Sequence, residues 1–296
     1  MTDSILYSVI LLALLGTVAA LVLYLVSKKF YVYEDPLIAT VEELLPGANC
    51  AGCGSPGCRS FAEKLVGSDD ISDLFCPVGG NEVMNLVAGA LGKEVTEQDP
   101  TVAVIRCQGS CEVRPKTTEY QGPRSCAISS LIYSGETDCQ FGCLGDGDCV
   151  EVCKFDAMYM DEATGLPVVI TDKCTSCGMC VEACPRNIIE MRPKHKRDLK
   201  IFVGCLNEEK GGIAKKACSV ACIGCSKCLD VCPKDAISMD NNLAYIDAEL
   251  CTLCRKCVDV CPTHSIIETN FPPRKKKKVE PEVTIKVEPV KPQNNA

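Results

Sequence analysis

Large side chains are scarce in this sequence. It has no tryptophan, and aromatic residues make up only 5% of its 296 residues. A conventional hydrophobic core therefore lacks the aromatic side chains that usually fill much of its volume, and other side chains have to fill that volume. The sequence has only two histidines, His195 and His264, neither paired with a carboxylate in a catalytic arrangement, and no Gly-rich dinucleotide fingerprint at a strand-to-helix turn. These absences argue against an active site or a nicotinamide site on this chain.

Positive charge is also in deficit. The formal net charge is −8 and the isoelectric point is near 5.0, which argues against nucleic acid as a partner. The basic stretch Arg192–Lys200 stands out against this background. We interpret it as a solvated linker, with electrostatic steering of an acidic partner protein as the alternative. The Lys275–Lys278 run belongs to a tail whose composition predicts disorder, where the lysines either aid solubility or bind anionic lipid or an acidic partner.

Cysteine, by contrast, is abundant. The chain contains 25 cysteines, close to the share at which composition alone indicates a disulfide or metal scaffold. The cellular compartment decides between the two, because thiols stay reduced in the cytoplasm. From Ile5 to Val26 no residue is charged, a run of about 33 Å as a helix, which is enough to span a bilayer. Lys28 and Lys29 follow this run, so the positive-inside rule predicts the N-terminus outside and the rest of the chain in the cytoplasm.

A cleaved signal peptide is the alternative interpretation of this apolar run. No Lys or Arg precedes the run, and it is longer than the usual apolar region of a signal peptide. We therefore favour a retained single-pass anchor in the cell inner (plasma) membrane. Metal ligation is then the expected role of the cysteines.

Two related blocks of sequence repeat with an offset of about 78 residues. In each block a Cys-x3-Cys pair is followed by a short β-rich run, then by a Cys-x2-Cys-x2-Cys-x3-Cys-Pro run and an Ile-Ile pair. The β-rich runs are 166–170 and 243–246. The pattern predicts short strands flanking small helices.

The second block contains two copies of the run found in bacterial ferredoxins. Three closely spaced thiolates bind one [4Fe–4S] cluster, and the fourth reaches the other cluster. The pattern predicts one cluster on Cys222, Cys225, Cys228 and Cys261, and another on Cys251, Cys254, Cys257 and Cys232. Structural zinc is the alternative, but it uses two Cys-x2-Cys pairs per ion and needs no third cysteine followed by Cys-Pro.

The first block keeps only the second of these two runs. Its first half reads Cys139-x3-Cys143-x5-Cys149-x3-Cys153, with Lys154 where Pro would stand. We expect two more [4Fe–4S] clusters, one on Cys139, Cys143, Cys149 and Cys184, the other on Cys153, Cys174, Cys177 and Cys180. Asp146 and Asp148 are interpreted as part of a turn, because two carboxylates alone make a poor cation site.

Another group of cysteines lies nearer the N-terminus, at Cys50, Cys53, Cys58 and Cys76. Glycines at 52, 54 and 57 allow the backbone to curl around a cluster and to direct N–H groups at its sulfurs, so we expect a fifth cluster here, with zinc as the alternative. Five cysteines remain, enough for a sixth cluster with one to spare, or for free buried thiols. These are Cys107, Cys111, Cys126, Cys205 and Cys218.

These patterns predict an α+β protein carrying five or six [4Fe–4S] clusters. Its expected parts are a transmembrane anchor (1–29), a small four-Cys [4Fe–4S] domain (30–95), a Cys-containing linking segment (96–135), two bacterial ferredoxin-like 2[4Fe–4S] domains (136–200 and 201–270) and a disordered tail (271–296). Folding should depend on cluster insertion, because the short segments lack an adequate apolar core without metal.

One stretch of the sequence resembles a known family. Leu44–Arg59, which reads LLPGANCAGCGSPGCR behind the apolar run and ahead of tandem ferredoxin motifs, is similar to the B subunit of the Rnf ion-translocating oxidoreductase complexes. The resemblance covers residues 1–270, and Phe141–Gly145 and Cys222–Cys225 are similar to the long, multi-cluster form of that protein.

The resemblance implies an electron-transfer subunit of a membrane complex. That complex oxidises reduced ferredoxin, reduces NAD+ and exports Na+ or H+, and this subunit would receive electrons from ferredoxin. The implied partners are the A, C, D, E and G subunits of the Rnf complex and soluble ferredoxin, with flavin, nicotinamide and the ion pathway on partner subunits. The chain would then serve a translocase without carrying a complete active site. The alternatives are the iron–sulfur subunit of another membrane oxidoreductase and a zinc-stapled membrane scaffold.

Overall fold

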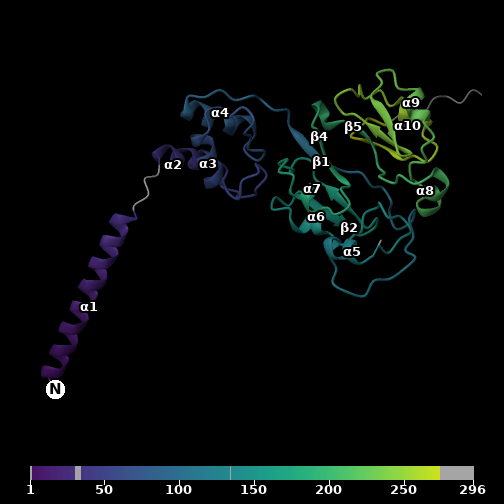
Figure 1. Ribbon diagram of the computed structural model, residues 1–296. Helices are drawn as coiled ribbons and strands as arrows, with labels where there is room; N and C mark the ends of the chain where they lie inside the picture. The colour runs from purple at the N-terminus through teal and green to yellow at the C-terminus, as the bar shows by residue number, and fades with distance from the viewer. Residues whose placement is uncertain (1, 31–34, 134, 274–296) are drawn as a thin grey trace, which may run out of the picture.

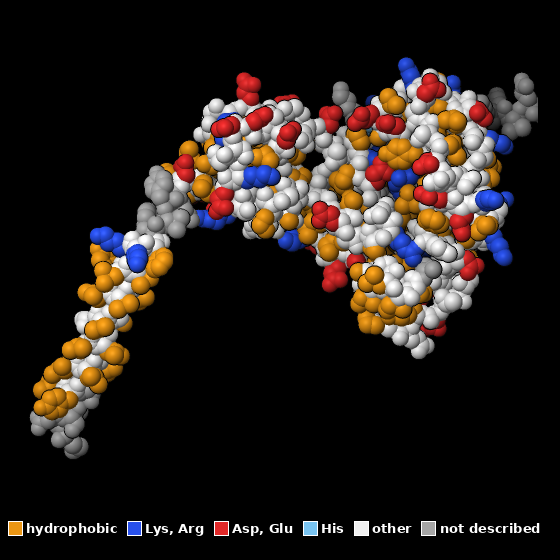
Figure 2. All heavy atoms as spheres, in the orientation of Figure 1, with side chains coloured by type: hydrophobic (Ala, Val, Ile, Leu, Met, Phe, Trp, Pro, Cys, Tyr) orange, Lys and Arg blue, Asp and Glu red, His pale blue; other side chains and the backbone are white. Residues whose placement is uncertain are grey.

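The computed structural model describes residues 2–30, 35–133 and 135–273. Almost all of the predicted tail therefore lies outside the described residues. Helix α1 (Thr2–Lys29) projects from the rest of the protein (Figure 1), and hydrophobic side chains cover the face of it seen in Figure 2. Its Val9–Lys29 portion is long and apolar enough to cross a bilayer. Such a surface is unfavourable in water and suited to hydrocarbon, in agreement with the predicted anchor.

Three helices form a small body beside the anchor. They are α2 (Pro36–Leu44), α3 (Cys58–Gly67) and α4 (Gly80–Leu91). Asp35 caps α2 by accepting a hydrogen bond from the Leu37 N–H at 2.9 Å. The core of this helical body consists mainly of large apolar side chains. They include Val41, Phe61, Leu65, Ile71, Met84 and Val87, each at most 1% exposed.

The first block contains two antiparallel pairs of strands. Strand β1 (Thr101–Ile105) pairs with β4 (Ile189–Pro193), so that Ile105 faces Ile189, and β2 (Met158–Asp161) pairs with β3 (Leu166–Val169). Its helices are α5 (Cys126–Ile132), α6 (Asp148–Glu151) and α7 (Met179–Ala183). The strand predicted at 166–170 is confirmed. Segment 96–135 does more than link, because it supplies the outer strand β1.

The second block repeats this arrangement. Strand β5 (Lys200–Val203) pairs with β8 (Ile266–Thr269), and β6 (Ile237–Asp240) pairs with β7 (Leu243–Ile246). Its helices are α8 (Gly211–Ala217), α9 (Lys227–Asp230) and α10 (Lys256–Val260). A 3-10 turn, η1 (Lys196–Asp198), joins the blocks. The strand predicted at 243–246 is confirmed, and both Ile-Ile pairs contribute to the closing strands β4 and β8.

Cysteines supply much of the buried core in both blocks, as the scarcity of aromatic residues predicts. The second block buries Cys205, Cys218, Cys222, Cys228 and Cys257 among aliphatic side chains. The first block buries Cys143, Cys149 and Cys180 in the same way. Because thiols form part of these cores, we expect the stability of the blocks to depend on what the thiols bind.

The interpretation of Arg192–Lys200 as a solvated linker is wrong at both ends. Arg192 is 2% exposed and Lys200 is 5% exposed. The Arg192 guanidinium donates to the Ile246 carbonyl at 2.9 Å, and Lys200 forms an ion pair with Asp198. A remote carbonyl at Arg192 and a neighbouring carboxylate at Lys200 explain this burial, since buried charges need hydrogen bonds and counter-charges. Within this stretch His195 is exposed, as expected.

Candidate iron–sulfur centres

Two of the cysteines nearest the anchor, Cys50 and Cys53, lie in a tightly turned loop between α2 and α3; Cys58 begins α3, and Cys76 precedes α4. Asn49, Ala51 and Gly54 all have positive φ angles, of 45°, 62° and 75°. Cys50 and Cys76 are buried, whereas Cys53 and Cys58 are partly exposed. The Gly79 N–H donates to the Cys76 sulfur at 3.4 Å, the type of bond that tunes an iron–sulfur centre. Burial raises the pKa of the Cys76 thiol, and the neighbouring Cys53 and Cys50 thiolates raise it further.

Gly52 shows why this loop needs glycine at one particular point. A Cβ atom placed there would lie 2.6 Å from the carbonyl oxygen of Cys177 and 3.0 Å from its Cα. The loop from the helical body therefore packs directly on a ligand loop of the first block. Lys154 strengthens this contact by donating to the Asn49 carbonyl at 3.0 Å.

Two cavities in the second block are each lined by one of the predicted sets of four cysteines. One set is Cys222, Cys225, Cys228 and Cys261, and the other is Cys232, Cys251, Cys254 and Cys257. Burial, with help from neighbouring thiolates, raises the pKa of Cys228 to about 11 and that of Cys257 to about 12. At Cys261 burial acts in the same direction, but hydrogen bonds from Ser265 and Thr263 outweigh it and lower the pKa.

One of the predicted groups in the first block also comes together. Burial, together with the Cys174 and Cys177 thiolates, raises the pKa of Cys180 to about 12, and Cys153 lies within electrostatic range of the same sulfur. The backbone reaches this arrangement through Gly178, whose φ of 77° precedes helix α7. The same thiol of Cys180 also senses Cys149, so the two groups of the first block are neighbours.

The other predicted group of the first block is only partly assembled. Cys143, Cys149 and Cys184 line one cavity, but the fourth cysteine on its wall is Cys126. Cys139 lies elsewhere, where its sulfur accepts a hydrogen bond from the side chain of Asn207 at 3.7 Å. The predicted assignment of Cys139 therefore lacks the geometric support that the other sets have.

Asp148 positions Cys126, which sequence reasoning left unassigned. Its carboxylate accepts hydrogen bonds from the Cys126 N–H at 2.8 Å, the Ala127 N–H at 3.0 Å and the Ser125 hydroxyl at 2.9 Å. These bonds fix the start of helix α5. Where the sequence predicts a turn, the chain bends at Asp146 and begins helix α6 at Asp148, with Gly147 between them at a φ of 89°.

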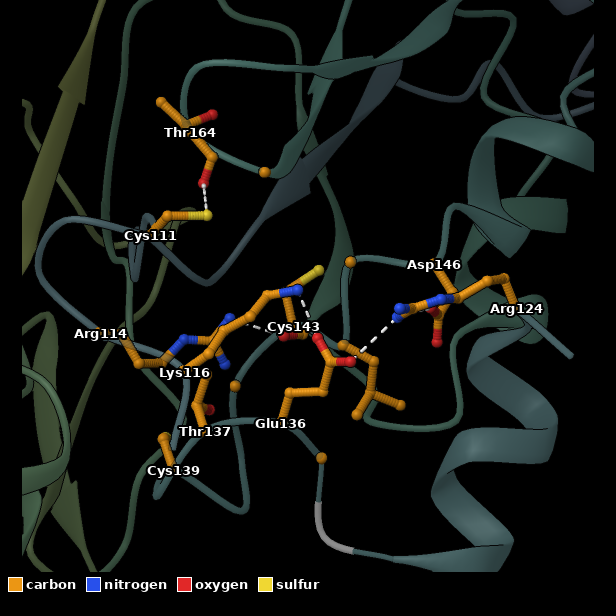
Figure 3. Close-up of a pocket in the computed structure, with 15 residues that line it drawn as sticks. Cys111, Arg114, Lys116, Arg124, Glu136, Thr137, Cys139, Cys143, Asp146 and Thr164 are labelled. Atoms are coloured by element: carbon orange, nitrogen blue, oxygen red, sulfur yellow. Dashed lines mark hydrogen bonds and ion pairs between the residues drawn. The ribbon is translucent and has the colours of Figure 1, made fainter. Parts of the chain in front are cut away.

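A pocket beside these cysteines is lined by charged groups (Figure 3). The Glu136 carboxylate lies between the Lys116 and Arg124 side chains, and Arg114 donates to the Cys143 carbonyl at 2.7 Å. Burial raises the pKa of Glu136, but hydrogen bonds from Lys116, the Tyr120 N–H and Arg124 outweigh it and bring the pKa to about 2.

Figure 3 shows Cys111 apart from the thiols of Cys139 and Cys143. Cys111 is exposed, and its sulfur contacts the Thr164 carbonyl at 3.6 Å. Of the five cysteines that sequence reasoning could not assign, it is therefore the one that remains outside the buried groups.

The donor sets suit iron–sulfur clusters better than single metal ions. Among residues 2–30, 35–133 and 135–273, no group of three or more Cys, His, Asp or Glu side chains is arranged to hold one metal ion. Structural zinc would need four ligands within about 2.3 Å of a single point. A cubane binds one thiolate at each of four separate corners, so its ligands need not converge on one point.

Fold and donor sets define an iron–sulfur electron carrier with several clusters and a candidate membrane helix. Family models agree: a 4Fe-4S dicluster domain matches residues 221–265, 4Fe-4S binding domains match 167–190 and 143–157, and an Fe-S cluster domain matches 45–77. The chain therefore binds [4Fe–4S] clusters.

Similarity to curated proteins identifies the family. The chain is 44% identical to the B subunit of the Na(+)-translocating ferredoxin:NAD(+) oxidoreductase complex of Acetobacterium woodii, over 85% of this chain and 74% of that protein. It is 39% identical to the B subunit of the proton-translocating ferredoxin:NAD(+) oxidoreductase complex of Clostridium ljungdahlii (84% and 86%) and 40% identical to the B subunit of the ion-translocating oxidoreductase complex of Methanosarcina acetivorans (85% and 94%). The chain belongs to the Rnf B-subunit family, as the resemblance of its N-terminal motif predicts.

Proposed function

We propose that this chain receives electrons from reduced ferredoxin and passes them through [4Fe–4S] clusters to partner subunits of a membrane complex. In that complex ferredoxin:NAD+ electron transfer drives export of Na+ or H+, the activity carried in the names of the relatives. The observation that supports this role most directly is the order of the cysteine groups in space. They extend from the second block, through the first, to the helical body beside α1.

Electrons enter, in this proposal, at the second block. Cys225 and Cys254, one from each of its two groups, are exposed and offer short paths to a docked protein. Exposed lysines flank both thiols, Lys227 beside Cys225 and Lys256 beside Cys254. An acidic ferredoxin would be attracted to this surface over long range at low salt.

Electrons leave near the membrane. Gly52 brings the Cys50–Cys76 group into contact with the Cys177 loop, so this group is the last before the anchor. The positive-inside rule applied to Lys28 and Lys29 places all clusters in the cytoplasm of a single-pass inner-membrane protein. The A, C, D, E and G subunits of the Rnf complex would then hold flavin, nicotinamide and the ion pathway, for which this sequence has no motif.

The chain's own residues would hold the clusters and set their potentials. When bound, each [4Fe–4S] cluster supplies a one-electron redox centre. The Gly79 N–H directed at Cys76 and the Ser265 hydroxyl near Cys261 favour extra negative charge on their sulfurs, which raises the reduction potential. Twenty cysteines form the five groups expected from the sequence, with Cys126 and Cys139 as competing candidates in one of them.

Anaerobic mixing of the full-length chain in detergent with reduced ferredoxin tests this proposal. EPR of rapidly frozen samples should show the clusters of the chain becoming reduced as ferredoxin is oxidised, and Lys227→Glu/Lys256→Glu should slow the reaction at low salt while leaving reduction by dithionite unchanged. Lys64→Glu, which alters an exposed charge on α3, is the matched control. Clusters that dithionite reduces but ferredoxin does not would refute the role. Co-purification with a quinone-linked dehydrogenase would instead support the alternative complex.

A further inference from the structure

The two blocks align through their cysteines beyond the ferredoxin runs. The spacing from Cys139 through Cys143 to Cys149 equals that from Cys218 through Cys222 to Cys228. In this alignment Asp146 stands at the position of Cys225. The duplication therefore makes Cys139 the counterpart of Cys218, a residue outside both ferredoxin runs of the second block. It also leaves the first block one thiol short.

A second equivalent pair follows the opening strands. Cys107 follows the end of β1 after one intervening residue, and Cys205 follows the end of β5 in the same way. Their surroundings match as well, because the Cys143 N–H donates to the Cys107 sulfur at 3.5 Å and the equivalent Cys222 N–H hydrogen-bonds Cys205. Each block therefore contributes two cysteines of the same kind that no ferredoxin run uses.

Asn207 links the sulfurs of Cys139 and Cys205 across the two blocks. Its side chain is 0% exposed. The Asn207 backbone N–H donates to the Cys205 sulfur at 3.4 Å, and its side-chain amide donates to the Cys139 sulfur at 3.7 Å. A buried amide directed at two thiols from different blocks is the arrangement expected beside a shared anionic group.

Arg114 links Cys139 to Cys218. A Cβ at Gly142 would meet the Arg114 guanidinium and lie 3.4 Å from the Cys139 sulfur, and one at Gly109 would lie 3.1 Å from Arg114 Nε and 3.5 Å from the Cys218 sulfur. Arg114 is 8% exposed, and within the described part of the chain its Nε has no hydrogen-bond partner. A buried cation with an open N–H calls for an anion, which a cluster held by four thiolates supplies.

We propose that Cys107, Cys139, Cys205 and Cys218 hold a sixth [4Fe–4S] cluster between the two blocks, two ligands from each. Cys126 then replaces Cys139 in the first block and supplies the thiol that Asp146 lacks, as the cavity shared by Cys126, Cys143, Cys149 and Cys184 indicates. Cys111, exposed and apart, is the one cysteine without a cluster.

This cluster would join two otherwise separate halves of the relay. Its ligand Cys205 adjoins Cys222 of the second block, and its ligand Cys107 adjoins Cys143 of the first. The role as a bridge rests on the proposed function, whereas the ligand assignment is tested without it. If ferredoxin failed to reduce the chain, the iron counts below would be unaffected.

Iron and acid-labile sulfide in the anaerobically purified full-length chain give the first test. Six clusters require about 24 iron atoms and as many sulfides per chain, whereas five require about 20. Iodoacetamide applied to the native protein should then label Cys111 alone, and a second reagent after denaturation should reveal the other cysteines. About 20 iron atoms in a fully loaded preparation would overturn the proposal.

Single substitutions give the second test. Cys205→Ala and Cys126→Ala should each lower the count to about 20 iron atoms and remove different EPR signals, whereas Cys111→Ala, the matched control, should keep about 24. If Cys139 instead binds the first-block cluster of Cys143, Cys149 and Cys184, Cys126→Ala will keep the full iron count, as Cys111→Ala does. Cys139→Ala will then remove the same EPR signal as Cys143→Ala. Should Cys205→Ala fail to fold, Cys205→Ser keeps an oxygen ligand, and an altered EPR signal with iron retained supports the assignment. An unchanged signal overturns it.

Discussion

Arg192 joins the two ferredoxin-like blocks, and we expect Arg192→Met to loosen the joint. The residue belongs to β4 of the first block, but its guanidinium donates to the Ile246 carbonyl at 2.9 Å and to the Ile201 carbonyl at 3.4 Å, both in the second. It also pairs with Glu190 at 3.2 Å and lies 5.4 Å from the centre of the Tyr245 ring. Methionine keeps an apolar stem of similar length but loses all these polar contacts.

The structure sets the size of the effect. Removing one member of a buried charge network costs about 3–5 kcal/mol, because its partners stay buried without it. Glu190 retains the Arg106 guanidinium at 3.2 Å and the Tyr245 hydroxyl at 2.9 Å, so the lower end of this range applies. For a domain of this size a loss of about 3 kcal/mol corresponds to a fall in Tm of about 6–12 °C.

Anaerobic thermal scans of the holoprotein, followed by cluster absorbance, measure this shift. Because cluster loss is irreversible, both proteins must be scanned at one fixed rate. Arg59→Met is the control: Arg59 forms ion pairs with Glu42 and Glu63, but its side chain is 49% exposed. Such a surface pair contributes at most about 1 kcal/mol. If Arg192→Met shifts Tm no more than the control does, the joint between the blocks does not depend on this buried guanidinium.

Three further outcomes are expected. Gly52→Ala forces a methyl group against a ligand loop of the first block, so it should lower the stability of the protein by about 1–3 kcal/mol and slow electron transfer to the anchor-proximal cluster. The control Gly89→Ala, in open space on α4, should be neutral or stabilising. Thermal scans compare the stabilities of the two variants, and stopped-flow absorbance compares their electron-transfer rates. Glu136→Gln should cost up to about 3 kcal/mol at pH 7, since the pKa of the carboxyl falls from 4.5 unfolded to about 2 folded. The stability that the ionised Glu136 carboxylate contributes is complete above the unfolded pKa and disappears as pH falls from 4.5 towards 2. The difference in Tm between Glu136→Gln and the wild type should therefore be constant between pH 8 and 6. A difference that shrinks in that range contradicts the lowered pKa of Glu136. Anaerobic iron chelation should abolish hydrogen-exchange protection in 136–270, where cysteines form much of the core. It should preserve protection in helices α2 to α4, whose core consists mainly of large apolar side chains. Equal loss of protection in both regions would refute the distinction.

Sequence reasoning succeeded where ligand spacing is short and repeated. The strands at 166–169 and 243–246 lie where the β-rich runs predict them, because each is held between two groups of cysteines close in sequence. Strand β1 was missed, since Val102–Val104 lies in a segment defined only by scattered cysteines and its partner β4 is remote in sequence. The equivalence of Cys107, after 101–105, and Cys205, after 200–203, could have revealed strand β1.

Long-range hydrogen bonds decided the remaining differences. The sequence around Arg192 predicts a solvated run of charged residues, yet its guanidinium donates to the carbonyl of Ile246, which is 54 residues away along the chain. Cys126 looks isolated, but the Asp148 carboxylate, 22 residues away, holds its N–H. Neither contact follows from local composition or period, because each depends on how two loops meet after the blocks have folded.

The cysteine-rich cores tie the fold of the blocks to their chemistry. In a protein with large apolar side chains, cofactor ligands can be lost while the core persists, as we expect for the helical body around Phe61 and Leu65. In the blocks, the buried side chains that hold the strands together include the ligands themselves. The positions of the clusters are therefore as fixed as the core, and a cluster shared by Cys107 and Cys205 would fix the two blocks relative to each other. Loss of that cluster should thus separate the blocks as well as interrupt the relay.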